Sequence, residues 1–157
     1  MSLNLVRVDD RLIHGQVVVG WGNAIGAHKI LLIDDHVAAA QWERDLYRLG
    51  VPPAMEVEFS SVAECAQVLE KVVKSKERVI VVIADIETLV RVCEVSHLVR
   101  RVNIGGLHER EGRKRRLSYL FLSDSEGDHL KALEANGVEV TARDVPSAKA
   151  VPLSEIL

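Results

Sequence analysis

The chain has 157 residues, 48% of them hydrophobic, and its 20 Lys and Arg residues against 23 Asp and Glu residues give a net charge of −3. This size suits one folded domain, residues 1–157, with a buried core, and the near balance of charge gives no indication of a nucleic-acid partner or an anionic membrane surface. The sequence shows neither a signal peptide nor an apolar run of the roughly 20 residues that span a bilayer, so we expect a cytoplasmic protein.

Strand-like and helix-like patterns alternate from the beginning of the chain. Residues 3–8 form a short apolar run that predicts a buried strand, and residues 29–33 form a second one. The apolar side chains between them recur at helical spacing and are Val17, Val18, Trp21 and Ile25. A longer helical pattern covers residues 37–49 and ends at Gly50, after which residues 55–59 alternate apolar and acidic side chains as an edge strand does.

The alternation continues through the second half of the chain. Ser61 and Glu64 match a capping box at the start of a third helix. The β-branched run 79–84 favours a central parallel strand, and a short helix is predicted after it. A later helix begins at the second capping box, formed by Ser123 and Glu126. The remaining strands are predicted at residues 100–104, 118–122 and 138–142.

This order of elements predicts an α/β fold. Helices should cover both faces of a mostly parallel central sheet, which gives a three-layer α/β/α single domain. The strands that begin near Leu3, Lys29, Val79 and Arg100 should be mutually parallel, because at least one helix separates each from the next.

The loop between the first strand and the first helix carries the strongest candidate site. His14 lies there, after the carboxyl end of a strand, which is where ligands bind in open α/β sheets. A phosphoryl group on His14 would be attracted by the backbone N–H groups at the start of the helix, near Gly15 and Gln16. Arg7 or Arg11 would hold the phosphate through paired hydrogen bonds.

A carboxylate beside His14 would complete this site. Asp9 or Asp10 would accept one imidazole proton, fix the tautomer and leave the other ring nitrogen as the nucleophile. The alternative is a histidine that satisfies a loop carbonyl within a solvated turn, because clustered charges mark a site only in some proteins. The residues alone leave both interpretations open.

Two further segments carry weaker signals. Gly105 and Gly106 follow a predicted strand, so they either form a turn with positive φ or let the backbone approach a phosphate closely. A basic run comes next and consists of Arg110, Arg113, Lys114, Arg115 and Arg116. Such a run is typical of a solvated loop, and the alternative is a surface that docks an acidic partner.

The cysteines and the other histidines show no metal-ligand spacing, so we expect no metal site. Cys65 and Cys93 lie in predicted helices without CxxC spacing, which predicts buried free thiols. The other histidines are scattered and are His28, His36, His97, His108 and His129. His108 is of interest because it follows the glycine pair and could face the same cleft as His14.

Residues 6–17, with the sequence VRVDDRLIHGQV, resemble the signature of the IIB components of the mannose/fructose/sorbose family of the bacterial phosphoenolpyruvate-dependent sugar phosphotransferase system. The similarity extends to residues 52–53, 102–107 and 151–153 and so covers essentially the whole chain. It implies a sheet of about seven strands and no metal or organic cofactor. It also implies that His14 accepts a phosphoryl group through Nδ1 from a phosphorylated IIA protein and passes it to a sugar bound by membrane IIC and IID subunits.

On this basis we expect a phosphotransferase, peripherally associated with a membrane transporter, in which His14, Asp9 and Arg11 are catalytic. The expected phosphate-binding residues are Arg7, Gly15, Gln16, Gly105 and Gly106. The chain departs from the family at Ala84, where many members have a small hydroxyl residue. A regulatory phosphoacceptor without a dedicated sugar is therefore one alternative, and a small-ligand-binding α/β domain is another. The sugar, and association with a second copy of the chain, are left open.

Overall fold

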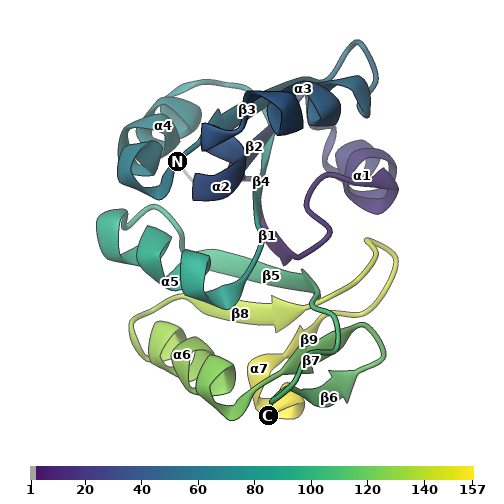
Figure 1. Ribbon diagram of the computed structural model, residues 1–157. Coiled ribbons are helices and arrows are strands. Elements are labelled where there is room, and N and C mark those ends of the chain that lie inside the picture. Colours follow the sequence, from purple (N-terminus) through teal and green to yellow (C-terminus); the bar gives the residue numbers. More distant parts are fainter. Residues whose placement is uncertain (1–2) are drawn as a thin grey trace.

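A seven-stranded sheet forms the middle layer of the protein, whose computed structural model describes residues 3–157 (Figure 1). In spatial order its strands are β3 (Glu56–Ser60), β2 (Lys29–Ile33), β4 (Val79–Ile83), β1 (Leu5–Asp9), β5 (Arg101–Gly106), β8 (Glu139–Ala142) and β9 (Val151–Pro152). Neighbouring strands are parallel, except that β9 is antiparallel to β8. The predicted α/β fold with a mostly parallel sheet of about seven strands is confirmed.

Helices cover both faces of this sheet, as a three-layer architecture requires. One face packs against α4 (Val62–Lys74), α5 (Ile86–Val95) and α6 (Asp124–Ala135). The other face packs against the π-helical turn η1 (Gln16–Trp21), α1 (Gly22–Ile25), α2 (Asp35–Ala39) and α3 (Gln41–Leu49). A last short helix, α7 (Leu153–Ile156), follows β9.

Strand β4 shows why the interior strands are continuous apolar runs. All five of its residues are buried. Val81 and Ile83 point into the core beneath α4 and α5, whereas Ile80 and Val82 point into the core beneath η1. Because both faces of a parallel sheet are covered, no position in such a strand meets water. Each buried Val or Ile contributes roughly 1.5–3 kcal/mol, which makes the sheet a rigid support for the loop after β1.

The segment 37–49, which the sequence predicts as one helix, is two helices. Asp34 accepts a hydrogen bond from the Val37 backbone N–H and so starts α2 two residues earlier than expected. Ala40 then adopts an extended conformation, with φ −113° and ψ 96°, and separates α2 from α3. The Arg44 guanidinium donates to the carbonyl of Ala38, which supplies a partner for the end of α2. The outer side of α3 exposes Trp42, Leu46 and Leu49.

The first predicted helix also differs from a regular α-helix. Its first six residues form η1, and α1 continues from it after Trp21. The wider π turn buries Val17, Val18 and Trp21 together, and the Trp21 indole N–H donates to the carbonyl of Asp144. Such π turns occur frequently at functional sites, and this one begins directly after His14 and Gly15.

The predicted strand at 118–122 lies outside the main sheet. Strands β6 (Lys114–Leu117) and β7 (Leu120–Leu122) form a separate antiparallel hairpin, because the basic residues of β6 cannot be buried between two helical layers. The sequence pattern also missed β9, which has only two residues.

Cys65 is buried and Cys93 is partly buried, and both are free as expected. Burial raises the pKa of Cys93 to about 11, so this thiol is a poor nucleophile.

Candidate active site

His14 lies in the loop that connects β1 to η1, at the carboxyl edge of the sheet. Its side chain is 17% exposed, and its Nε2 atom is 3.2 Å from Oδ2 of Asp9. An ionised carboxylate can only accept hydrogen bonds, so Nε2 carries the proton in this contact. In the neutral imidazole the Nδ1 atom then keeps its lone pair, which makes it the nucleophilic nitrogen of the ring.

Asp9 is completely buried and is the centre of the site. Its Oδ1 accepts hydrogen bonds from the backbone N–H and from Nε of Arg11, each at 3.0 Å, and its Oδ2 accepts from Arg11 Nη2 at 3.0 Å. Burial would raise the pKa of this carboxyl, but the hydrogen bonds from His14 and Arg11 and the charge of Arg7 outweigh burial and hold the pKa well below its usual range. Asp9 is therefore ionised at neutral pH.

Arg11 links this buried carboxylate to the surface. Its side chain is 35% exposed, and besides its paired bonds to Asp9 it donates from Nη2 to Oε1 of Gln16 at 3.0 Å. Gly15 and Gln16 are exposed at the start of η1, next to His14. The loop is closed by a turn in which the Leu12 backbone N–H donates to the Asp9 carbonyl at 3.0 Å, and Leu12 has a φ of 59°.

Arg7 lies within β1, and its side chain is completely buried. Its Nη1 donates to Oδ1 of Asn103 at 2.6 Å and to the Arg143 carbonyl at 2.8 Å. Its Nη2 donates to the Asp144 carbonyl at 2.9 Å and to Asp9 Oδ2 at 3.3 Å. Arg7 therefore contacts Asp9 from inside the protein, and its role as a phosphate ligand stays a prediction.

The glycine pair is part of β5 and is not a turn. Neither Gly105 nor Gly106 has a positive φ, and both are buried. A Cβ atom on Gly105 would lie 2.3 Å from Cζ of Arg7, and one on Gly106 would lie 3.3 Å from Nη2 of Arg11. The interpretation as a turn with positive φ is therefore wrong: a Cβ at Gly105 would collide with the Arg7 guanidinium, whereas one at Gly106 would require Arg11 to shift by only a few tenths of an ångström.

The second aspartate of the loop binds a different histidine. Asp10 accepts the backbone N–H of His108 on Oδ2 at 2.8 Å, and its Oδ1 lies 2.6 Å from Nδ1 of the same residue. Of the two carboxylates that the sequence offered as partners of His14, Asp9 thus fills that place. His108 lies at the same edge of the sheet, with 71% of its side chain exposed.

The basic run is only partly solvated. Arg113 is 4% exposed and forms two hydrogen bonds of 2.9 Å with the carboxylate of Glu126. Lys114 and Arg116 both bind Asp124, with distances of 3.1 and 3.2 Å. The prediction of a solvated loop thus holds in its solvation for the exposed Arg110, Lys114 and Arg115, and it is wrong for Arg113, which is buried against Glu126, and as a loop for residues 114–117, which form β6.

Ala84 and Asp85 follow β4, the strand next to β1. Asp85 accepts the Thr88 backbone N–H at 2.7 Å and caps α5. The carboxylate after Ala84 thus has a structural partner in the helix.

Sequence reasoning missed Asn103, Arg143 and Asp144, which supply acceptors to Arg7. The available signal was Arg7 itself, because a charged side chain inside a buried strand requires hydrogen-bond acceptors in the protein interior.

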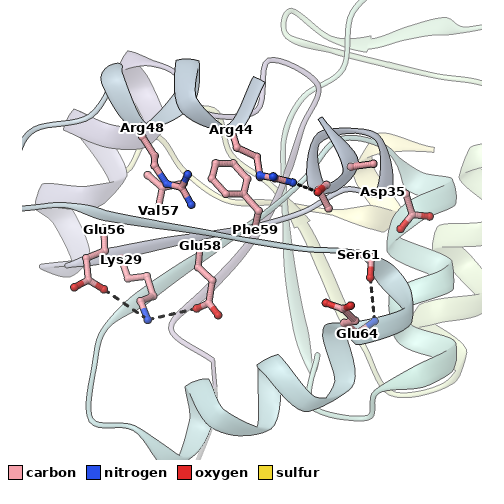
Figure 2. Close-up of a pocket in the computed structure, with 12 residues that line it drawn as sticks. Lys29, Asp35, Arg44, Arg48, Glu56, Val57, Glu58, Phe59, Ser61 and Glu64 are labelled. Atoms are coloured by element: carbon pink, nitrogen blue, oxygen red, sulfur yellow. Dashed lines mark hydrogen bonds and ion pairs between the residues drawn. The ribbon is translucent and has the colours of Figure 1, made fainter. Parts of the chain in front are cut away.

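A pocket of about 600 Å³ lies elsewhere, along the edge strand β3 (Figure 2). There Lys29 pairs with Glu56 and Glu58, and the Arg48 guanidinium lies 5.1 Å from the ring centroid of Phe59. Two strands separate β3 from β1, so this pocket is distinct from the His14 site.

Within residues 3–157 no group of three or more His, Cys, Asp or Glu side chains is arranged to hold a metal ion, and no helix is long and apolar enough to cross a membrane.

Comparison with known families gives a match over nearly the whole chain. The family model described as PTS system sorbose subfamily IIB component matches residues 3–157. The mannose-specific EIIAB component of Escherichia coli (strain K12) is 27% identical over 157 residues, which are 100% of this chain and 49% of that protein. The sorbose-specific EIIB component of Klebsiella pneumoniae is 28% identical over 151 residues, covering 96% of this chain and 92% of that one. The chain thus spans about half the length of the first relative and nearly all of the second.

Solved structures agree with this match. The IIBSor domain of the sorbose permease from Klebsiella pneumoniae superposes with a TM-score of 0.88 at 29% identity, covering 99% of this chain and 96% of that one. The manxB structure from Thermoanaerobacter tengcongensis gives a TM-score of 0.89 at 27% identity, covering 99% of this chain and 94% of that one. The similarity therefore includes β1, η1 and the loop with His14 between them.

Proposed function

Because this chain belongs to the sorbose-subfamily IIB components of the phosphotransferase system, we propose that it carries a phosphoryl group on His14, accepting it from a phosphorylated IIA protein and passing it to a sugar. The observation that carries this proposal is the contact between Nε2 of His14 and the buried carboxylate of Asp9. This contact leaves Nδ1 with its lone pair in a side chain that solvent reaches.

The first transfer follows from that arrangement. Nδ1 of His14 attacks the phosphorus atom, and the bond to the donor breaks with its electron pair staying on the donor. The proton on Nε2 remains in place, so the phosphorylated ring carries a positive charge opposite the Asp9 carboxylate, 3.2 Å away. In the second transfer the bond between Nδ1 and phosphorus breaks, and His14 leaves as a neutral imidazole with its proton still on Nε2.

Arg11 and the start of η1 hold the phosphoryl oxygens in this proposal. The Nη1 group of Arg11 makes none of the contacts to Asp9 or Gln16, which use Nε and Nη2. The side-chain amide nitrogen of Gln16 and the backbone N–H groups at the start of η1, from Gly15 onward, are further hydrogen-bond donors for the phosphoryl oxygens. Arg7, Gly105 and Gly106 act beneath them, as the support that fixes Asp9 and Arg11.

The partners follow from membership of the family. A phosphorylated IIA protein is the donor, and the acceptor is a sugar presented by membrane IIC and IID subunits, so the protein works at the cytoplasmic face of a transporter. No metal or organic cofactor takes part in the relay. Relatives named for mannose, sorbose and N-acetylgalactosamine all match this chain, so the comparison does not single out one sugar.

A regulatory phosphoacceptor without a dedicated sugar is the second candidate, and it is motivated by Ala84, which follows β4 at a position where many family members have a small hydroxyl residue. This candidate shares the first transfer and lacks the second. Activity of the labelled protein toward sugars in the presence of IIC and IID subunits therefore separates the two.

The experiment is transfer of radioactive phosphate from a phosphorylated IIA protein to the purified chain. We expect one phosphate per chain in the wild type and none in His14→Gln, while circular dichroism shows the same fold in both. His36→Gln is the matched control, because His36 is another histidine that contacts a carboxylate, with Nε2 3.0 Å from Glu43. Undiminished labelling of His14→Gln would contradict the proposal.

A further inference from the structure

Two adjacent carboxylates hold two histidines in opposite orientations. Asp9 contacts His14 through Nε2, whereas Asp10 contacts His108 through Nδ1 at 2.6 Å. Because the Asp10 carboxylate accepts the Nδ1 proton, the lone pair of the His108 ring is on Nε2. That nitrogen belongs to a side chain that is 71% exposed.

His108 is held firmly for an exposed residue. Its backbone N–H donates to Asp10 at 2.8 Å, and its carbonyl accepts a hydrogen bond from Nη1 of Arg113 at 2.9 Å. Arg113 is in turn fixed by its paired bonds to Glu126. The hydrogen bonds of His108 thus go to the Asp10 carboxylate, from its ring and its backbone N–H, and to the Arg113 guanidinium, at its carbonyl.

The strand register brings the two histidine–aspartate pairs to one edge. Asp9 lies opposite Gly106 in the pairing of β1 with β5, and the Asp10 backbone N–H donates to the Gly106 carbonyl at 2.9 Å. His108 comes two residues after Gly106. Both imidazoles therefore lie where β1 and β5 end, and only His14 has a role in accepting the phosphoryl group.

We propose that His108, oriented by Asp10, is the general base that removes the proton of the sugar hydroxyl during the second phosphoryl transfer. This inference rests on the proposed function. Transfer from a donor to an imidazole nitrogen requires no base, since Nδ1 of His14 already has a lone pair. A sugar hydroxyl, in contrast, must lose its proton as its oxygen bonds to phosphorus.

In this second transfer the hydroxyl oxygen bonds to phosphorus, and the bond from phosphorus to Nδ1 of His14 breaks with its electron pair on the nitrogen. The hydroxyl proton moves to Nε2 of His108. The Asp10 carboxylate stabilises the resulting imidazolium. His108 then releases the proton to water.

The test separates the two transfers. Wild type and His108→Gln are labelled by a phosphorylated IIA protein and then mixed with membranes that contain the cognate IIC and IID subunits and with mannose, sorbose or N-acetylgalactosamine. We expect equal labelling of both proteins but at least about a 10-fold slower release of label to sugar from His108→Gln, since general-base catalysis typically contributes 10²–10⁴-fold. His36→Gln, which removes an exposed histidine paired with Glu43, should behave as wild type in both steps.

A second variant distinguishes a base from a structural support. His108→Ala should also be labelled normally, and added imidazole should restore part of its transfer to sugar, because the position is open to solvent. Unchanged sugar transfer in His108→Gln would overturn the inference, as would an equal loss of labelling and sugar transfer. Absence of label in the wild type would instead refute the proposed function, and labelling without transfer to any of the three sugars would refute the second step alone.

Discussion

The Oδ2 atom of Asp9 is shared between Nε2 of His14, at 3.2 Å, and Nη2 of Arg11, at 3.0 Å. One buried carboxylate oxygen thus contacts both the His14 ring and a guanidinium that reaches the surface. The replacement Asp9→Asn removes the negative charge opposite the ring and leaves the buried Arg7 without its carboxylate. We expect labelling of His14 to slow by at least about 10-fold and the free energy of unfolding to fall by about 3–5 kcal/mol, as when one partner of a buried ion pair is removed.

The matched control for Asp9→Asn is Asp10→Asn, which changes the neighbouring carboxylate and leaves the contacts of Asp9 intact. Labelling rates and urea unfolding curves measure both effects. Equal labelling rates in Asp9→Asn and wild type would show that the carboxylate does not orient His14.

Stability at acid pH depends on the same group. The pKa of Asp9 in the folded protein lies below its value of about 3.9 in an unfolded chain, so the unfolded state binds the proton more readily. The contribution of Asp9 to stability is therefore complete above about pH 4 and is lost as the pH falls toward the lower pKa of the folded state. Urea unfolding at pH 5 and pH 3 should show a larger loss for wild type than for Asp9→Asn. A loss of equal size in both would contradict this origin.

Arg11 provides a graded test of phosphate binding. A hydrogen bond to a charged group is worth about 1.5–3 kcal/mol, so losing one that strengthens in the transition state slows transfer by roughly 10- to 100-fold. We expect this effect in Arg11→Ala and a smaller one in Arg11→Lys, which keeps the charge but loses the paired geometry on Asp9. Initial rates of labelling measure the series. A lysine variant slower than the alanine variant would contradict the role of charge.

Gly105→Ala tests the close approach of Arg7 to β5. The added methyl group would lie 2.3 Å from the guanidinium carbon, so Arg7 must move away from Asn103 and Asp9. We expect a loss of about 1–3 kcal/mol in the free energy of unfolding, the usual cost of overpacking, together with slower labelling.

Thermal unfolding of Gly105→Ala is best compared with that of Gly20→Ala. The new Cβ of Gly20 would meet its nearest neighbour, the Pro146 side chain, at an ordinary 3.7 Å. Gly20→Ala should therefore be at least as stable as wild type, and equal stability of Gly105→Ala would show that Arg7 can move freely.

Much of the fold could be predicted because its signals are local. The strands at Lys29–Ile33 and Val79–Ile83 are short apolar runs between polar ends, and the capping box of Ser123 and Glu126 is present with both of its hydrogen bonds. The break at Ala40 had no such signal, since alanine is the best helix former and nothing in its neighbours predicts an extended residue.

The site was predictable only where its contacts are close in sequence. Asp9, Arg11 and His14 lie close together at the end of β1 and in the loop after it, and a carboxylate, a guanidinium and an imidazole at this spacing predict a candidate site. The environment of Arg7 could not be foreseen in the same way, because two of its acceptors are carbonyls more than 130 residues away, and a carbonyl is present at every residue. The glycine pair was equally ambiguous, since a turn and a close approach of side chains both require glycine.

The position of the phosphoryl group on the imidazole tests the central claim most directly. The protein is phosphorylated by a IIA protein with its histidines labelled with ¹⁵N, and the ring nitrogens are assigned by ¹H–¹⁵N and ³¹P NMR. We predict phosphorus bonded to Nδ1 of His14 while Nε2 keeps its proton beside Asp9. Phosphorus on Nε2, or on any residue other than His14, would contradict the account.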